Sequence, residues 1–150
     1  MSRDAVADDE LNLGLLCFIA FRSAETEIMG VLAAAGYDDL TVPQARVLAR
    51  LSPDGIRMSD LAEQAQVTKQ TASSLVDHLE RAGYVTRVVD PSDQRSRVVR
   101  FATRGRAARR VAWRAQATVE ARWSEHLGSR RTKALRDALT ALRAITDPWA

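Results

Sequence analysis

Residues 58–103 read MSDLAEQAQVTKQTASSLVDHLERAGYVTRVVDPSDQRSRVVRFAT, and this stretch changes its pattern three times. A short helix is expected first, because Ser59 is a good N-cap and Asp60 puts a negative charge at the positive end of the helix dipole. A second helix is expected from Lys69 to Ala82. One of its faces is apolar at helical spacing, through Ala72, Leu75, Val76 and Leu79.

The polar side chains of the second helix are concentrated at its N-terminus, as they are in a helix that reads DNA bases. The first residues of such a helix reach base edges, and its free amides and dipole favour phosphate. Gln can pair bidentately with adenine, and Lys can donate to guanine or phosphate. The candidate contacts are the cap Thr68 with Lys69, Gln70, Thr71, Ser73 and Ser74. The alternative is an ordinary solvated face that binds nothing.

Two β-rich runs follow the second helix, YVTRVV at 84–89 and RVVRFA at 97–102. Seven residues separate the runs, too many for a two-residue hairpin, so the tip is expected to project. At that tip, Asp93 is expected to hold the guanidinium of Arg95 as a pre-aimed donor, and Arg97 adds positive charge. The alternative is a solvated turn with a local ion pair.

Helix, turn, helix and β-hairpin in this order indicate a winged helix-turn-helix, a unit that reads DNA. The expected fold class is therefore mainly α with a small β-hairpin wing, an α+β arrangement. The charge distribution agrees. Residues 55–114 carry twelve basic and six acidic side chains, whereas residues 1–54 carry four basic and nine acidic ones. A basic excess on the DNA-reading segment is the electrostatic footprint of a nucleic-acid-binding protein.

The chain resembles the MarR family of bacterial transcription regulators over essentially its whole length. The residues that carry the resemblance are DPSDQRSR at 90–97 and FATRG at 101–105, with LAE at 61–63 and LERAGY at 79–84 upstream. The resemblance implies a homodimer whose two winged helices bind double-stranded DNA at a pseudo-palindromic operator. It also implies that Asp93 and Arg95 belong to the wing tip and that Arg95 enters the minor groove.

At 150 residues the chain is expected to form one domain, 1–150. A DNA-binding part at 41–103 lies between two helical segments, 9–35 and 104–147, that are expected to be dimerisation helices. Apolar residues recur at helical spacing along the first segment and in two stripes along the second. Three such helices, far apart in sequence, favour dimerisation over packing within one subunit.

Polar residues mark the expected starts of the other helices. Thr41 is expected to cap one helix, with Pro43 in its first turn. Thr103 and Ser129 are expected to cap the last two helices. Residues 56–58 are expected to pair with the wing as a short strand.

The chain has no apolar run long enough to span a membrane, and its N-terminus lacks the charged-then-apolar layout of a signal peptide. A cytoplasmic protein without a membrane partner is therefore expected. Enzymatic activity is not expected, because the two histidines, His78 and His126, lie on different predicted helices and no phosphate-binding or dinucleotide motif is present. No cofactor is expected, and two His and one Cys do not make a metal-sensing site.

Cys17 is the only cysteine and excludes an intramolecular disulfide. A peroxide-sensing branch of the MarR family, OhrR, has a cysteine in its first helix, and Cys17-Phe18 occupies a similar place. That branch also supplies tyrosines that hydrogen-bond the thiolate, whereas Tyr37 here lies beyond the first helix. Because its neighbours are apolar, Cys17 is expected to face apolar surroundings and to be inert.

A small-molecule effector is the more usual mode of the family, with a pocket between the dimerisation helices and the winged helix. Phe18, Phe21 and Arg22 from the first helix and Arg46 from the second are the candidate lining residues. Either arginine could hold an aromatic carboxylate, or both could make structural ion pairs.

The sequence thus favours a dimeric, sequence-specific DNA-binding regulator. Repression is the family's commoner role, and a small ligand is expected to release the protein from its operator. The alternatives are a one-cysteine peroxide sensor and a winged helix that serves only as a protein-interaction module. An interaction module has no need of Asp93 and Arg95 beside further arginines. The sequence does not name the effector, the operator or the regulated genes.

Overall fold

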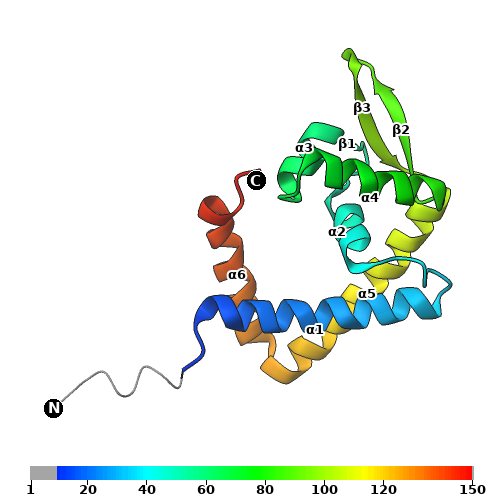
Figure 1. Cartoon of the computed structure of the whole chain (residues 1–150). Helices are drawn as coiled ribbons and strands as arrows, with labels where there is room; N and C mark the ends of the chain where they lie inside the picture. Colours follow the sequence, from blue (N-terminus) through cyan, green and yellow to red (C-terminus); the bar gives the residue numbers. More distant parts are fainter. Residues whose placement is uncertain (1–9, 150) are drawn as a thin grey trace.

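The computed structural model describes residues 10–149, which form six helices and a three-stranded sheet (Figure 1). Helix α1 (Leu13–Ala34) packs against α5 (Thr103–Leu127), and α6 (Ser129–Thr146) turns back along α5. The segment between α1 and α5 holds the remaining elements: α2 (Val42–Arg50), β1 (Ile56–Arg57), α3 (Met58–Gln64), α4 (Lys69–Arg81), β2 (Val85–Asp90) and β3 (Asp93–Phe101). This is a winged helix-turn-helix flanked by long helices, so the expected fold class is confirmed.

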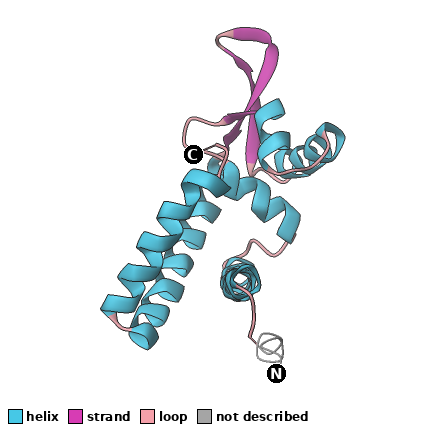
Figure 2. Ribbon diagram, turned by 90° about the vertical axis from the view of Figure 1, so that its left-hand side faces the viewer, coloured by secondary structure: helices cyan, strands magenta, loops and turns pink. Residues whose placement is uncertain are grey.

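The sheet has the order β1-β3-β2, and both pairings are antiparallel. Ile56 pairs with Val99 and Arg57 with Val98, which confirms the short strand expected beside the wing. Met58 already belongs to α3. Figure 2 shows the hairpin of β2 and β3 standing away from the helices as a wing.

Two of the expected helix caps are present. Thr41 Oγ1 accepts a hydrogen bond from Gln44 N at 3.4 Å, and the Gln44 side chain accepts one from Thr41 N at 3.0 Å, so α2 begins with a full capping box. Thr68 Oγ1 accepts from Thr71 N at 3.1 Å and caps α4.

The other three expected caps are wrong by one or two residues. Helix α3 begins at Met58, directly after β1, so Ser59 lies inside its first turn. Thr103 and Ser129 are the first residues of α5 and α6, and neither makes a side-chain cap. In each case a residue that lacks a capping side-chain bond holds the N-cap position: Arg57, Ala102 and Gly128. At α6, the residue before the helix is Gly128, whose φ of +83° suits glycine.

The first helix also differs from expectation at its start. Asp9, the residue expected to begin it, lies outside the described residues. Within them, α1 begins at Leu13, and Asn12 Oδ1 accepts from Leu15 N at 2.8 Å as its cap. An asparagine in an extended conformation satisfies one of the free amides of the first turn.

The core lies in the winged helix-turn-helix and includes one side chain from each long helix beside it. Its buried members are Leu32 of α1, Leu40, Val47, Leu51, Leu61, Val76, Leu79, Tyr84, Val85, Val99 and Ala108 of α5. The side chains of α4 in this core are those of its predicted apolar face. Because that face is buried, the opposite face of α4 must point to solvent.

The start of α5 is joined to the end of α4 and to the α1–α2 loop at one junction. Arg104 donates to Asp39 Oδ2 at 2.8 Å and to the Ala82 carbonyl at 2.9 Å, and its guanidinium carbon lies 4.4 Å from the centre of the Tyr84 ring. The Tyr84 hydroxyl donates to Asp39 Oδ1 at 2.5 Å. These bonds hold the pKa of the Asp39 carboxyl below its ordinary value. Gly105 sits directly against the Tyr84 backbone.

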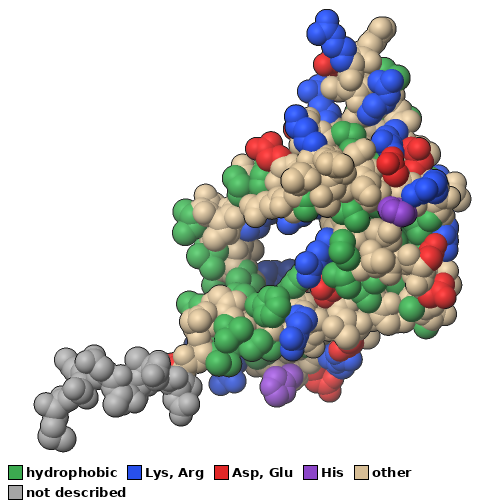
Figure 3. Space-filling model, viewed as in Figure 1, with side chains coloured by type: hydrophobic (Ala, Val, Ile, Leu, Met, Phe, Trp, Pro, Cys, Tyr) green, Lys and Arg blue, Asp and Glu red, His purple; other side chains and the backbone are tan. Residues whose placement is uncertain are grey.

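Outside this core, α1 and α6 leave apolar side chains exposed in the single chain. They include Leu13, Leu16, Phe18 and Ile19 on α1 and Leu135, Leu139, Leu142 and Ile145 on α6. Helix α6 has no buried residue at all. Figure 3 shows apolar side chains on the part of the surface where α1 and α6 lie, and an opening between α6 and the winged helix. Within residues 10–149, no helix has the length and apolar character needed to cross a bilayer.

We expect Gly105→Ala to destabilise the fold by about 3 kcal/mol, because an added methyl group would be forced into packed backbone. An ideal Cβ at Gly105 would lie 1.9 Å from the Tyr84 carbonyl oxygen. The matched control is Gly30→Ala in α1, where a Cβ would meet nothing within 4 Å. Alanine favours helix by about 1 kcal/mol over glycine, so the control should be neutral or stabilising. Thermal unfolding followed by circular dichroism measures both, and equal melting temperatures for the two variants would contradict the junction.

Candidate nucleic-acid interface

The buried face of α4 determines which of its side chains can reach a ligand. Ala72, Val76 and Leu79 are buried in the core, and the tight turn between α3 and α4 places Gln66 at a φ of +53°. The N-terminal end of α4 therefore leaves Lys69 and Gln70 exposed to solvent. Ahead of them, the Thr68 hydroxyl donates to Thr71 Oγ1 at 2.9 Å while it caps the helix.

The wing differs from its sequence-based prediction at the tip. The strands run almost to the end and are joined at Pro91 and Ser92, so the prediction of a long loop is wrong. The register then shifts: Asp90 pairs with Asp93 and Val89 with Arg97. Three residues of β3, 94–96, consequently have no partner on β2 and bulge from the hairpin.

This bulge is held by hydrogen bonds between its side chains and its backbone. Asp93 Oδ1 accepts from Arg95 N at 3.0 Å, and Arg97 Nη1 donates to the carbonyls of Gln94 and Ser96 at 3.2 and 3.3 Å. Asp93 therefore fixes the Arg95 backbone and does not hold its guanidinium, so the predicted side-chain brace is wrong. The physical reason is proximity, because an aspartate readily accepts from the amide two residues further along the chain.

The base of the wing turn is fixed by a second set of bonds. Asp90, only 6% exposed, accepts from Ser92 N at 2.9 Å and from Ser92 Oγ at 2.8 Å. Arg57 Nε lies 2.7 Å from the other oxygen of Asp90. The two Ser92 bonds, together with the Arg57 guanidinium, hold the pKa of the Asp90 carboxyl below its ordinary value. The wing turn is thereby attached to β1, next to α3.

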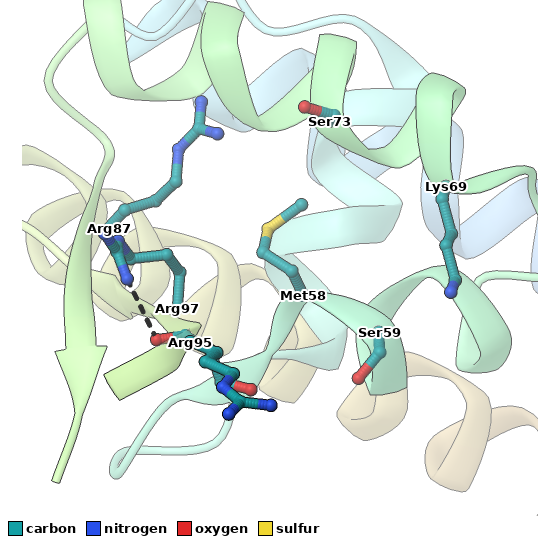
Figure 4. A pocket seen from close by; sticks show the side chains of 8 residues that line it. Met58, Ser59, Lys69, Ser73, Arg87, Arg95 and Arg97 are labelled. Carbon is teal, nitrogen blue, oxygen red and sulfur yellow. Dashed lines mark hydrogen bonds between the residues drawn. The ribbon is translucent and has the colours of Figure 1, made fainter. Parts of the chain in front are cut away.

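A pocket of about 370 Å³ lies between α4 and the wing (Figure 4). It is lined by Met58, Ser59, Lys69, Ser73, Arg87, Arg95, Ser96 and Arg97. In Figure 4 the arginines lie on one side and Lys69 on the other, with Met58 between them. Four cationic side chains on one groove form a surface suited to polyanions, and we call it the α4–wing groove.

The predicted DNA-contacting residues divide into two groups. Lys69, Ser73, Arg95 and Arg97 line the α4–wing groove. The others are exposed but lie outside its lining: Thr68 at the cap of α4, Gln70, Thr71 and Ser74 on α4, and Asp93 at the wing tip.

The sequence-based prediction omitted Met58, Ser59, Arg87 and Ser96 from the groove. Arg87 could have been found from its sequence, because it stands in the first β-rich run, where alternation places it on the same sheet face as Val85 and Val89.

The predicted effector residues lie on the exposed part of α1 and on α2. The Arg22 guanidinium stands over the Phe18 ring at 5.9 Å, and that of Arg46 over Phe21 at 5.9 Å. Arg46 is also bidentate to Glu25, at 2.9 and 3.0 Å, so it makes the structural ion pair that the sequence left as one possibility. None of the four predicted residues lines a second pocket of about 260 Å³ between α1 and α5, which Glu27, Val31, Val111, Arg114, Ala115, Thr118 and Val119 surround.

Cys17 lies on the exposed apolar face of α1. The thiol is exposed in the single chain, so the expectation of apolar surroundings is not met within one subunit. Tyr37 lies away from it, with its ring 6.2 Å from that of Tyr84. Among residues 10–149, no three His, Cys, Asp or Glu side chains converge as metal ligands would.

Comparison with known proteins places this arrangement in a family. The sequence profile of the MarR family matches residues 38–96. The transcriptional activatory protein BadR of Rhodopseudomonas palustris is 32% identical over 133 residues, which cover 85% of this chain and 75% of BadR. An HTH-type transcriptional repressor of Mycobacterium tuberculosis is 34% identical over 114 residues, 75% of this chain and 78% of the repressor. The chain belongs to the MarR family.

Solved structures agree with the MarR family assignment. The transcriptional repressor CouR, bound to a 23-mer DNA duplex, superimposes with a TM-score of 0.67 at 28% identity, over 87% of this chain and 92% of CouR. Members of the MarR family are transcription regulators, not enzymes. This chain is accordingly a DNA-binding transcription regulator.

We expect Asp93→Asn to keep operator affinity within about twofold, because an amide oxygen can accept the same bond from Arg95 N. Asp93→Ala removes the acceptor and should weaken binding about 2–10-fold, the equivalent of a typical net hydrogen bond. Fluorescence anisotropy with labelled operator DNA measures both. If Asp93→Asn binds as weakly as Asp93→Ala, DNA affinity depends on the negative charge of Asp93. That result would support an ion pair between Asp93 and the Arg95 guanidinium in the DNA complex.

Proposed function

We propose that the protein binds a pseudo-palindromic operator as a homodimer, represses transcription there, and leaves the operator when it binds a small anionic ligand. The α4–wing groove is the observation that carries the DNA-binding part of this proposal. Lys69 comes from the N-terminus of α4, and Arg95 and Arg97 come from the wing, so two elements present positive charge to one surface. Such a surface can follow the backbone of a duplex while α4 enters the major groove.

The side chains on this surface suit different parts of DNA. Gln70 and Ser74 are exposed near the N-terminus of α4, where a recognition helix contacts base edges. Arg95 belongs to the bulge at the end of the wing, and its backbone is fixed by Asp93. A narrow minor groove concentrates negative potential and favours an inserted guanidinium. We therefore assign Thr68, Lys69, Gln70, Thr71, Ser73 and Ser74 to the major groove, and Asp93, Arg95 and Arg97 to the wing contact.

The exposed apolar side chains of α1 and α6 support the homodimer. Monomeric proteins rarely expose contiguous apolar patches of this kind, and burial of Leu135, Leu139 and Leu142 requires a partner surface. A second copy supplies the same apolar side chains, as a two-fold interface requires. Two-fold symmetry also explains a pseudo-palindromic operator, because each winged helix then reads one half-site.

The similar proteins support both directions of regulation, since one is a repressor and BadR is an activator. We propose repression because it needs only that the dimer occupy the operator, whereas activation needs a further surface for the transcription machinery. A reporter gene under the operator tests this: deletion of the regulator should raise expression, and a fall in expression would indicate activation.

The effector is proposed to be an aromatic carboxylate that stacks on Phe18 or Phe21 of α1 and pairs with Arg22. Arg46 is already occupied by Glu25, whereas no acidic partner for Arg22 occurs among the described residues. Benzoate should raise the melting temperature of the wild type more than benzamide does, because only the carboxylate can pair with a guanidinium. Arg22→Ala should remove the difference. Equal effects of the two compounds on the wild type would contradict an anionic ligand.

We expect Arg95→Ala to weaken operator binding by about 1–3 kcal/mol, the usual scale for a good groove contact. It should also lower the slope of log affinity against log salt by about one unit. Arg100→Ala is the matched control, because it removes the same charge from β3 at an exposed position outside the groove lining. Gln70→Ala should instead relax the preference at one position in each half-site. Titration of the operator at two salt concentrations measures all three. Wild-type affinity for Arg95→Ala in an intact dimer would favour the protein-interaction module.

We expect the wild type to sediment as a dimer at micromolar concentration and Leu139→Glu to sediment as a monomer. A buried carboxylate without a partner is costly, so it should open an interface that contains Leu139. Thr140→Glu is the control, because Thr140 is the next residue of α6 and does not belong to its apolar stripe. A monomeric wild type, or a dimeric Leu139→Glu, would contradict the proposed interface.

A further inference from the structure

Arg87 of β2 lines the α4–wing groove, yet its side chain is already engaged by two carboxylates of α4. Its Nη2 contacts Asp77 Oδ1, and its Nε lies 3.4 Å from Glu80 Oε2. The same Glu80 oxygen accepts from the backbone amide of Arg87 at 3.1 Å. The Arg87 side chain is only 24% exposed, whereas those of Asp77 and Glu80 are 51% and 45% exposed. The Arg87 side chain is thus the most buried of the three.

We propose that Arg87 is a positioning residue that sets the distance and angle between the wing and α4, and that it does not itself neutralise a DNA phosphate. This inference rests on the proposed function, in which α4 and the wing contact DNA together. Arg87 and the acidic pair Asp77 and Glu80 are called the wing clamp below.

The position of the clamp in the fold makes it suited to this role. Arg87 stands in the middle of β2, opposite Val99 of β3, so a force on its side chain acts on the whole hairpin. Asp77 and Glu80 are three residues apart and lie on the same side of α4. The far end of the hairpin is held separately by Arg57 and Asp90. Val85 and Val99 at the base of the hairpin also pack in the core with Val76 and Leu79 of α4, and the clamp adds a polar connection between β2 and α4 beside the groove.

The groove depends on this connection because its two sides belong to different elements. Lys69 and Ser73 belong to α4, whereas Arg95 and Arg97 belong to the wing. Side chains that recognise a ligand must be held to within about 0.5 Å of their working geometry. A wing that pivots on β2 would move Arg95 relative to Lys69 by more than that. Both contacts could then not be made on one duplex without an additional ordering cost.

The opposing explanation is that Arg87 swings out to a phosphate and that Asp77 and Glu80 only lower its affinity for DNA. The two explanations differ in the sign of one experiment. Under the opposing explanation, neutralising the two acids frees a cation and removes negative charge next to DNA, so binding strengthens. If the clamp operates, the same change loosens the wing, and binding weakens although the net charge rises by two.

The test compares operator affinity and its salt dependence across one set of full-length variants. The double variant D77N/E80Q should bind about tenfold more weakly than the wild type, and R87A should do the same. Both should keep the wild-type slope of log affinity against log salt, because no phosphate contact is lost. Glu63→Gln is the matched control: it removes an exposed acid from α3 that has no ion pair among the described residues, and it should not weaken binding.

A charge exchange separates positioning from a general loss of stability. The variant D77R/E80Q/R87D restores an ion pair between β2 and α4 with the charges reversed and leaves no α4 carboxylate facing the new acid, so it should recover at least half of the affinity lost in R87A. Tighter binding by D77N/E80Q, or a salt slope lowered by about one unit in R87A as in R95A, would overturn the clamp. If R95A also binds as the wild type does, the groove is not the DNA surface, and the proposed function fails together with the clamp.

Discussion

The contact between Gly105 and the backbone of Tyr84 is the constraint on which the rest of the structure depends. A Cβ at residue 105 would lie 1.9 Å from the Tyr84 carbonyl oxygen, so only glycine lets α5 approach the end of α4 this closely. The approach lets Arg104 reach Asp39 and the Ala82 carbonyl, at 2.8 and 2.9 Å. Three segments far apart in sequence meet there: the α1–α2 loop, the C-terminus of α4 and the N-terminus of α5. A movement of α5 therefore acts directly on the end of α4, the helix that we propose reads DNA.

This junction connects the two functional halves of the molecule. On one side, the apolar faces of α1 and α6 remain exposed in the single chain, where we propose the second subunit and the effector bind. On the other side, α4 and the wing carry the cationic groove. A ligand can shift DNA affinity only by favouring one arrangement of these halves over another. The short path from α5 to α4 makes such a shift physically reasonable, because the Arg104 side chain bonds directly to the carbonyl of Ala82, the C-cap residue of α4.

Local patterns in the sequence were sufficient to predict the helices, the wing and half of the residues that line the groove. The spacing of Ala72, Val76 and Leu79 identifies the buried face of α4, and the alternation in 97–102 identifies β3, because both depend on neighbours along the chain. Contacts between distant residues could not be predicted in this way. Nothing in the sequence pairs Arg104 with Asp39, or Arg87 with two acids of α4. The caps were misplaced because the helices begin one or two residues earlier than the polar residues suggested. Asp93 was misassigned because the amide of Arg95, two residues along the chain, is its partner.

Hydroxyl-radical footprinting of the operator complex tests the central claim most directly, namely that α4 and the wing bind DNA together in a two-fold dimer. The account predicts two protected segments related by two-fold symmetry, with centres about one helical turn apart. Protection should extend into the flanking minor grooves, and Arg95→Ala should remove only these flanks. A single protected segment, or flanks that remain protected in Arg95→Ala, would contradict the account.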